Sequence, residues 1–193
     1  MGFNQEKVYT IYAGVNGAGK STIYGIMNSV SDEKWVNSDE ILSAAGGDWS
    51  VEKDQWKAMK EAAFRINHYI KEGISFSQET TLAGRTNIIT IRKAKEQGFF
   101  IRLYYVGLAN ADLAVERVRQ RVEAGGHGIE EDLIRKRYDA SLIRLKEVLP
   151  LCDLALIYDN TEMFRKVAKY EEKRWIFYEN SCDWFANVIS EME

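Results

Sequence analysis

The stretch VYTIYAGVNGAGKST, residues 8–22, decides the fold of this chain. Residues 8–13 are β-rich and apolar at successive positions, which predicts a central strand buried on both faces. Residues 14–21 match the pattern G-x-x-x-x-G-K-[ST] in full, and residues 20–29 read as a helix. A strand, a glycine-rich turn and a helix in this order predict a phosphate-binding loop.

Each residue type in this loop suits phosphate chemistry. The glycines let backbone N–H groups curl around a β-phosphate, and the helix N-terminus adds a positive dipole. Lys20 is expected to bridge the β- and γ-phosphates, and Ser21 to hold Mg²⁺. The structural alternative is a glycine-rich turn with a surface lysine, which the agreement of motif and context disfavours. The predicted nucleotide is ATP, with GTP left open, and the predicted binding residues are Gly14, Asn16, Gly17, Ala18, Gly19, Lys20, Ser21 and Thr22.

Outward from the loop, predicted strands alternate with predicted helices. The strands are expected at residues 8–13, 34–37, 74–78, 99–107 and 153–158, and the helices at 20–29, 54–71, 84–97, 111–122 and 131–149. This alternation predicts an α/β fold over residues 1–193, a single P-loop kinase-like three-layer domain with a five-stranded parallel sheet. A hairpin is expected at residues 164–178, turning near Glu171 and Glu172, followed by a closing helix at 181–190.

The periodicity of residues 54–71 also predicts which side of that helix is buried. Apolar residues recur three and four positions apart, as in an amphipathic helix that ends at Gly73. The face expected to be buried consists of Trp56, Met59, Ala63, Ile66 and Ile70.

Composition excludes several classes of protein. With 46% hydrophobic and 28% charged residues among 193, the chain can bury a real core. The net charge of −3 lacks the basic excess of a duplex-binding protein, so no nucleic-acid partner is expected. No apolar run reaches membrane-spanning length and the start is polar, so we expect a cytoplasmic protein without a membrane partner. Cys152 and Cys182 form no metal or redox pattern.

Polar residues follow several predicted strands, where a parallel sheet places its active site. Asp39 could accept the proton of an attacking hydroxyl, or it could belong to a capping box made by Asn37 and Glu40. Glu79, followed by two threonines, suits a polyol or sugar, or equally a cap-and-turn cluster. Asp159 could be a Walker-B carboxylate on the metal, but a turn is favoured because Asp-Asn is common turn chemistry.

Residues 117–137 are predicted to form a lid. Two helices are joined by the flexible stretch EAGGHG, and their arginines include Arg117 and Arg121 on the first and Arg135 and Arg137 on the second. Such arginines stabilise charge on a transferring phosphoryl group and close over ATP. The alternative is a solvated, charge-balanced helical hairpin. His127 is expected to be an ordinary loop residue, because flanking glycines give it little rigid support.

Seven stretches occur in order between residues 14 and 160: GVNGAGKST, VNSDEIL, FSQETTLAGR, LYYVGL, ERVRQRVEAGGHGI, IRKRYDASL and LIYDN. Together they resemble the zeta-toxin family of P-loop kinases, particularly its short bacterial members. The phosphate loop alone is widespread, whereas the ordered set is far more specific.

The resemblance implies a role for each matched position. It implies ATP at residues 14–22 with Mg²⁺ at Ser21, Asp39 as the base on the acceptor hydroxyl, and catalytic arginines at Arg121 and either Arg135 or Arg137, of which Arg137 is preferred. The expected acceptor contacts are Glu79, Thr80, Thr81 and Arg85. The implied acceptor is a UDP-N-acetylamino sugar such as UDP-N-acetylglucosamine, phosphorylated on its 3′-hydroxyl. An antitoxin protein is the implied partner.

The chain departs from the family pattern in three places. The phosphate loop begins 14 residues in, the acceptor motif reads Glu-Thr-Thr rather than Glu-Gly-Thr, and the lid is glycine-rich and holds His127. These departures bear on the antitoxin and the acceptor, not on phosphoryl transfer. Two alternatives stay open. One is a metabolic or antibiotic-modifying small-molecule kinase, and the other is an ATPase switch without a small acceptor, which predicts a firm Walker-B carboxylate.

Overall fold

The computed structural model describes residues 6–27, 34–178, 182–190 and 192. Its strands are β1 (Val8–Gly14), β2 (Lys34–Val36), β3 (Phe76–Thr80), β4 (Phe100–Gly107), β5 (Leu154–Asp159), β6 (Arg165–Glu171) and β7 (Arg174–Phe177). Its helices are α1 (Lys20–Met27), α2 (Ser38–Ala44), α3 (Glu52–Glu72), α4 (Thr86–Glu96), α5 (Ala111–Glu123), α6 (Glu131–Val148) and α7 (Asp183–Ser190), with a 3₁₀ turn at Leu149–Leu151. The predicted order of strands and helices is confirmed; residues 28 and 29 of the first predicted helix lie outside the described residues.

The strands form one sheet in the order β2-β3-β1-β4-β5-β6-β7. The first five in this order are parallel, as predicted, and β1 lies between β3 and β4 because its apolar side chains are buried on both faces. The predicted hairpin is confirmed, and it extends the same sheet, since β6 pairs antiparallel with β5. Its turn places Glu172 and Lys173 at positive φ, as a tight hairpin requires.

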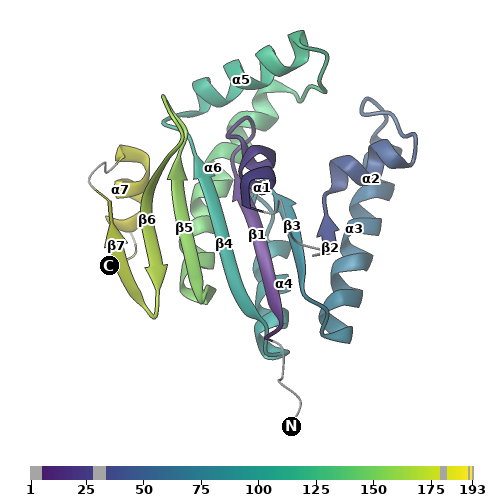
Figure 1. Cartoon of the computed structure of the whole chain (residues 1–193). Coiled ribbons are helices and arrows are strands. Elements are labelled where there is room, and N and C mark those ends of the chain that lie inside the picture. The colour runs from purple at the N-terminus through teal and green to yellow at the C-terminus, as the bar shows by residue number, and fades with distance from the viewer. Residues whose placement is uncertain (1–5, 28–33, 179–181, 191, 193) are drawn as a thin grey trace.

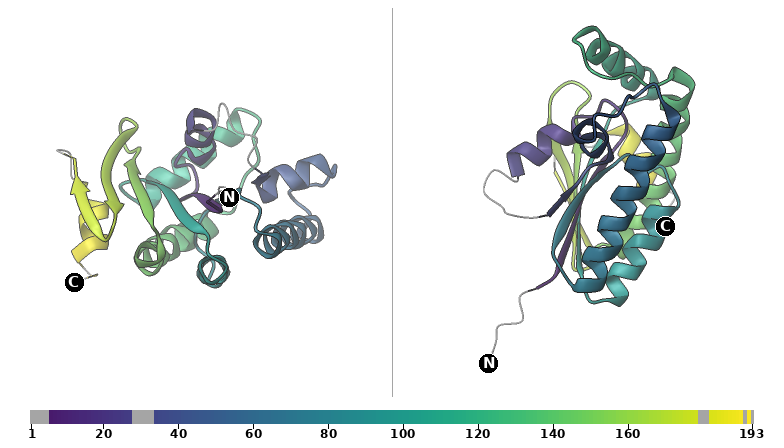
Figure 2. Two further views of the ribbon diagram at one scale, coloured as in Figure 1. Left: turned by 60° about the horizontal axis from the view of Figure 1, so that its bottom comes forward. Right: turned by 90° about the vertical axis from the view of Figure 1, so that its right-hand side faces the viewer.

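Helices cover the two faces of the sheet unequally. Figure 2 shows α3, α4 and α6 together on one face and α1 on the other. The carboxyl ends of the parallel strands point toward α5, at the top of the molecule in Figure 1. The phosphate loop, the N-terminus of α2 and the predicted lid therefore meet at one end of the sheet. No helix within the described residues is long and apolar enough to cross a membrane.

The predicted buried face of α3 is wrong in its first half. Trp56 and Met59 are 56% and 59% exposed, and Ala63 is exposed as well. The buried stripe runs at intervals of four residues instead: Ala58, Ala62, Ile66 and Ile70. Ala58 and Ala62 allow α3 to pack closely against the neighbouring elements, so the first half of its buried face consists of small residues rather than large ones. Gly73 ends the helix as predicted, in the left-handed conformation with φ +68°.

Helix α7 is fixed to the sheet by close packing at the end of β4. A Cβ added at Gly107 would lie 2.3 Å from Cζ2 of Trp184, so only glycine lets this indole rest on the strand. The indole Nε1 donates to the buried carboxylate of Asp159 at 3.0 Å, which prevents the ring from sliding away.

We expect Gly107→Ala to lower the free energy of unfolding by about 1–3 kcal/mol, because the new methyl group displaces a fixed indole ring. Chemical denaturation monitored by circular dichroism measures this change. Gly25→Ala is the matched control, since a Cβ there has no atom within 4 Å and α1 is helical at this position. Equal stability of Gly107→Ala and the unchanged protein would contradict the proposed packing.

Candidate active site

The phosphate loop leaves β1 through backbone geometry that only glycine adopts easily. Gly14 has φ +145°, and a Cβ there would lie 2.1 Å from the carbonyl oxygen of Val106. Gly17 and Gly19 also have positive φ, at +74° and +94°. The side-chain amide of Asn160 donates to the carbonyl of Ala18 at 2.9 Å, which ties the loop to the end of β5. The predicted loop between a strand and a helix is therefore present, with its glycines where they are needed.

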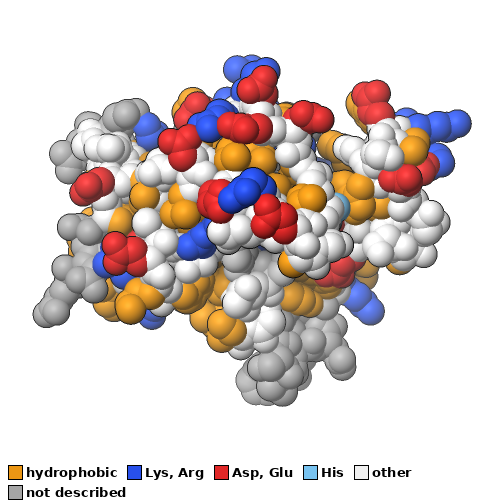
Figure 3. All heavy atoms as spheres, turned by 90° about the horizontal axis from the view of Figure 1, so that it is seen from above, with side chains coloured by type: hydrophobic (Ala, Val, Ile, Leu, Met, Phe, Trp, Pro, Cys, Tyr) orange, Lys and Arg blue, Asp and Glu red, His pale blue; other side chains and the backbone are white. Residues whose placement is uncertain are grey.

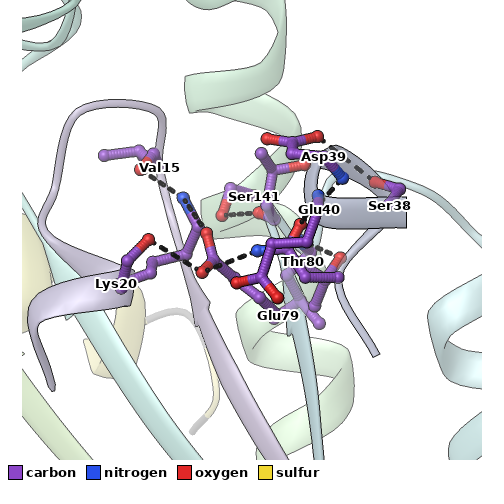
Figure 4. Close-up of polar contacts among 12 residues, drawn as sticks. Val15, Lys20, Ser38, Asp39, Glu40, Glu79, Thr80 and Ser141 are labelled. Carbon is purple, nitrogen blue, oxygen red and sulfur yellow. Dashed lines mark hydrogen bonds and ion pairs between the residues drawn. The ribbon is translucent and has the colours of Figure 1, made fainter. Parts of the chain in front are cut away.

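Lys20 begins α1 and points back under the loop (Figure 4). Only 8% of Lys20 is exposed, and its Nζ donates to the carbonyl of Val15 at 3.2 Å. The same Nζ lies 4.0 Å from Oε1 of Glu79. Burial lowers the pKa of the Lys20 ammonium, while the carboxylates of Glu79 and Asp39 act in the opposite direction. This ammonium is held close to carboxylates in a site of low polarity, where a phosphate would be bound strongly.

Glu79 lies on β3, which pairs directly with β1. Its Oε2 accepts from the Ser21 hydroxyl at 2.9 Å and from the Asn37 side-chain amide at 3.2 Å. Burial raises the pKa of this carboxyl group, and Lys20 opposes the shift. The structure thus brings Glu79 beside the phosphate loop, and its contact with an acceptor stays a prediction.

A hydroxyl and a carboxylate in contact fit the ligands that Mg²⁺ prefers. Ser21 and Glu79 offer such oxygen atoms next to the predicted phosphate position. Mg²⁺ is typically bound through one or two protein oxygens together with phosphates and water. Bound there, the ion would neutralise and orient the phosphate oxygens. Ser21 was the predicted metal ligand; Glu79 joins it through the pairing of β3 with β1, which spacing along the chain does not reveal.

The N-terminus of α2 presents Asp39 without using it as a cap. Asn37 is the N-cap residue, and its Oδ1 accepts from the backbone N–H groups of Asp39 at 2.8 Å and Glu40 at 3.4 Å. The other half of the predicted capping box is replaced, because the Glu40 carboxylate accepts from the indole of Trp35 at 2.9 Å. The Asp39 side chain remains 45% exposed and is available for chemistry.

The residues after Glu79 hold a turn. Thr80 Oγ1 accepts from the backbone N–H of Leu82 at 3.1 Å, and the carbonyl of Thr81 accepts from Ser141 Oγ at 2.7 Å. These contacts match the cap-and-turn alternative. Arg85 is exposed at the start of α4 and makes no side-chain capping bond. Contact of Thr80, Thr81 and Arg85 with an acceptor stays a prediction.

The four arginines singled out in the predicted lid differ in their contacts. Arg135 forms ion pairs on the surface with Glu131 at 2.7 Å and with Asp112 at 2.6 Å. Arg137 is partly buried, and burial lowers the pKa of its guanidinium while Asp39 raises it. Arg121 has Nε and Nη2 buried without a hydrogen-bond partner among the described residues. Arg117 donates to the carbonyl of Thr161 at 3.0 Å, at the base of the lid.

Asp159 lies at the end of a strand rather than in a turn. It is the last residue of β5 and 1% exposed. Its oxygens accept from Thr161 Oγ1 at 2.6 Å, from Arg165 Nε at 3.1 Å and from the Trp184 indole at 3.0 Å. The favoured turn interpretation is therefore wrong, and the carboxylate serves to join β5, β6 and α7.

His127 is held more firmly than its glycine neighbours suggested. Its ring lies parallel to that of Trp49, with centroids 4.0 Å apart and planes at 4°. Its Nε2 lies 3.5 Å from Oδ2 of Asp39. His127 lies in a loop, as expected. The expectation that it has little rigid support is wrong, because Trp49 comes from a segment distant in sequence that no local pattern links to the predicted lid.

Charges of both signs alternate over this end of the molecule. Figure 3 looks onto it from above, and lysine and arginine side chains there lie among acidic ones. This face shows no broad basic patch within the described residues.

Comparisons with known proteins support the fold and a family. No family model matches the chain. A Haemophilus influenzae protein of uncharacterized function is 33% identical over 127 residues, which cover 66% of this chain and 89% of that protein.

Solved structures share the fold at low sequence identity. A chain of the AvrRxo1-ORF1:AvrRxo1-ORF2 complex with ATP superposes with a TM-score of 0.67 and 15% identity, covering 98% of this chain. This chain spans only 64% of that chain's length. A chain of the PezAT chromosomal toxin–antitoxin system of Streptococcus pneumoniae gives 0.64 and 16%, covering 100% of this chain and 79% of that one. A candidate kinase of Chloroflexus aurantiacus gives 0.56 and 17%, covering 70% and 78%. The chain thus belongs to the family of the Haemophilus influenzae protein, and it shares its fold with chains of the AvrRxo1-ORF1:AvrRxo1-ORF2 complex and of the PezAT system.

Proposed function

We propose that this protein transfers the γ-phosphoryl group of ATP to a hydroxyl group of a small molecule. The observation that carries the proposal is the pair of buried nitrogens of Arg121 that have no hydrogen-bond partner in the part of the chain that the structure describes. Arg121 and Arg137 both repel the buried ammonium of Lys20, so three cations lie close to one another. Buried donors without partners cost free energy, so this site calls for an anion with several oxygen atoms. A polyphosphate on the phosphate loop supplies them.

In this proposal, one side of the site binds the phosphates and the other side accepts the proton of the acceptor hydroxyl. Lys20 and the loop hold the phosphates, while Arg121 and Arg137 meet charge that grows on the transferring group. Asp39 faces the site from α2 and interacts electrostatically with both Lys20 and Arg137. A hydroxyl placed between Asp39 and the γ-phosphate could give its proton to this carboxylate.

The acceptor that we propose is a nucleotide-activated amino sugar of the UDP-N-acetylglucosamine type. The support is the resemblance of the ordered motifs to zeta toxins, together with the shared fold. The partly exposed carboxylate of Asp39 leaves room for a hydroxyl at the mouth of the site. A nucleoside, sugar or antibiotic acceptor would use the same phosphate-binding residues, so the product must decide between these classes.

A protein partner of the antitoxin kind is part of the proposal. The support is the origin of two structures that share the fold, one from an AvrRxo1-ORF1:AvrRxo1-ORF2 complex and one from the PezAT toxin–antitoxin system. The proposed location is the cytoplasm, where ATP and such acceptors occur.

Incubation with ATP and a panel of UDP-sugars, nucleosides and aminoglycosides, read by mass spectrometry, tests the function. We expect one phosphoryl group added to a UDP-N-acetylamino sugar, and none with Lys20→Ala, because that variant lacks the buried ammonium. A phosphorylated nucleoside or antibiotic would instead identify a metabolic or antibiotic-modifying kinase. Rapid ATP hydrolysis without any phosphorylated product would identify an ATPase switch.

We expect Asp39→Asn to lower the transfer rate by at least a factor on the order of a hundred, since an amide cannot accept the proton. Thermal stability and ATP affinity should stay near those of the unchanged protein, because Asn37 and not Asp39 caps α2. Steady-state kinetics measures the transfer rate, nucleotide titration the ATP affinity and thermal denaturation the stability. If expression arrests growth, this variant should relieve the arrest. A variant that melts early but turns over normally would assign Asp39 a structural role.

Arg137→Ala should lower the rate of transfer by about a hundredfold and weaken ATP binding less, since the charge it meets grows in the transition state. Arg135→Ala is the matched control two residues away, because its guanidinium is bound to Glu131 and Asp112 on the surface. We expect that control to keep its rate. Equal rates for the two variants would remove Arg137 from the catalytic site.

A further inference from the structure

One contact joins the lid to the opposite side of the active site. The lid loop between α5 and α6 carries His127, and the segment between α2 and α3 carries Trp49. Their rings stack in parallel at 4.0 Å. The edge of the same imidazole faces Asp39, with Nε2 3.5 Å from Oδ2. A single side chain thus contacts both the far segment and the carboxylate proposed as the base.

The glycines around His127 fix its backbone against α5. Gly126 donates its backbone N–H to the carbonyl of Arg121 at 2.8 Å. A Cβ at Gly126 would lie 2.7 Å from Cγ of Arg121, so no other residue allows this approach. Gly125 has φ +89°, which starts the turn. The backbone next to His127 is therefore held against the turn of α5 that carries Arg121.

The charges around the imidazole favour its neutral form. The titratable and charged groups that face it are Asp39 from α2 and Arg121 from α5. Burial and Arg121 lower the pKa of His127, and Asp39 opposes them. A neutral imidazole can donate an N–H hydrogen bond to Asp39 and leave that carboxylate able to accept a proton. Stacking on Trp49 restricts the rotation of the ring and thereby the direction of this donor.

We propose that Trp49 and His127 form a latch that holds the lid closed over the active site, and that His127 is a positioning residue for the Asp39 carboxylate. The proposal rests on the proposed kinase function. Closure brings Arg121 over the phosphate loop, and the stack keeps it there while water is excluded. Opening the stack releases Arg121 and Asp39 together, so the latch couples the phosphate side of the site to the acceptor side.

Tryptophan fluorescence of the ligand-free protein tests the stack without reference to activity. His127→Gln removes the ring that covers Trp49, so the emission maximum should shift to the red. The same substitution made in a Trp49→Phe background should cause no shift, since the tryptophan that stacks on His127 is then absent. His68→Gln is the control, because this histidine lies exposed on α3. An unshifted spectrum, or an equal shift in both backgrounds, would overturn the latch whether or not the protein is a kinase.

Two substitutions separate stacking from the positioning of Asp39. His127→Phe keeps a ring on Trp49 but loses the N–H donor, whereas His127→Gln keeps a donor and loses the ring. We expect both to lower kcat roughly tenfold with little change in the KM for ATP. His127→Gln alone should also raise acceptor-independent ATP hydrolysis relative to transfer, because the lid no longer excludes water. Wild-type kcat in both variants would overturn the positioning role. Absence of any transfer by the unchanged protein would overturn the proposed function and leave the fluorescence result to decide the stack.

Discussion

The burial of the Lys20 ammonium is the constraint on which the active site depends. A buried ammonium is costly unless carboxylates or an anion lie close to it. Glu79 lies 4.0 Å away on β3, and it is there because β3 pairs in parallel with β1. The sheet order therefore determines the electrostatics of the phosphate loop. With β1 at the centre, the loop lies between a carboxylate on one neighbouring strand and the close backbone of β4 on the other.

The lid adds more positive charge than the ligand-free site can balance. Arg121 and Arg137 both act on Lys20 and lower its pKa, which is the opposite of what a self-contained ion-pair network would do. Asp39 and Glu79 offset part of this charge, but two nitrogens of Arg121 still lack a hydrogen-bond partner among the described residues. Such a site is suited to an anion. Without the anion, repulsion between the cations opposes closure of the proposed lid, so closure requires a contact outside the charged site. The stack of His127 on Trp49 supplies a contact that carries no charge.

What the sequence predicts well here is local. The phosphate loop, the parallel strands, the hairpin turn at Glu172 and Lys173 and the end of α3 at Gly73 all follow from residues adjacent in the chain. What it misses depends on contacts between distant segments. The elements packed against α3 determine which of its residues are buried. The pairing of β3 with β1 determines the position of Glu79. The stack of His127 depends on Trp49, 78 positions earlier in the chain. Asp159 belongs to the same group, since its partner Trp184 lies on α7.

The hairpin and α7 bear on the site through the strand that they stabilise. At the end of β5, the carboxylate of Asp159 accepts hydrogen bonds from Arg165 on β6 and from Trp184 on α7, which hold it in place. The next residue, Asn160, donates to the carbonyl of Ala18 in the phosphate loop, and the carbonyl of Thr161 receives Arg117 from the base of the lid. Loop and lid are thus both anchored to one short segment after β5. Because β6 and α7 hold Asp159 in place, the C-terminal part of the chain also fixes the segment to which the phosphate loop and the proposed lid are anchored.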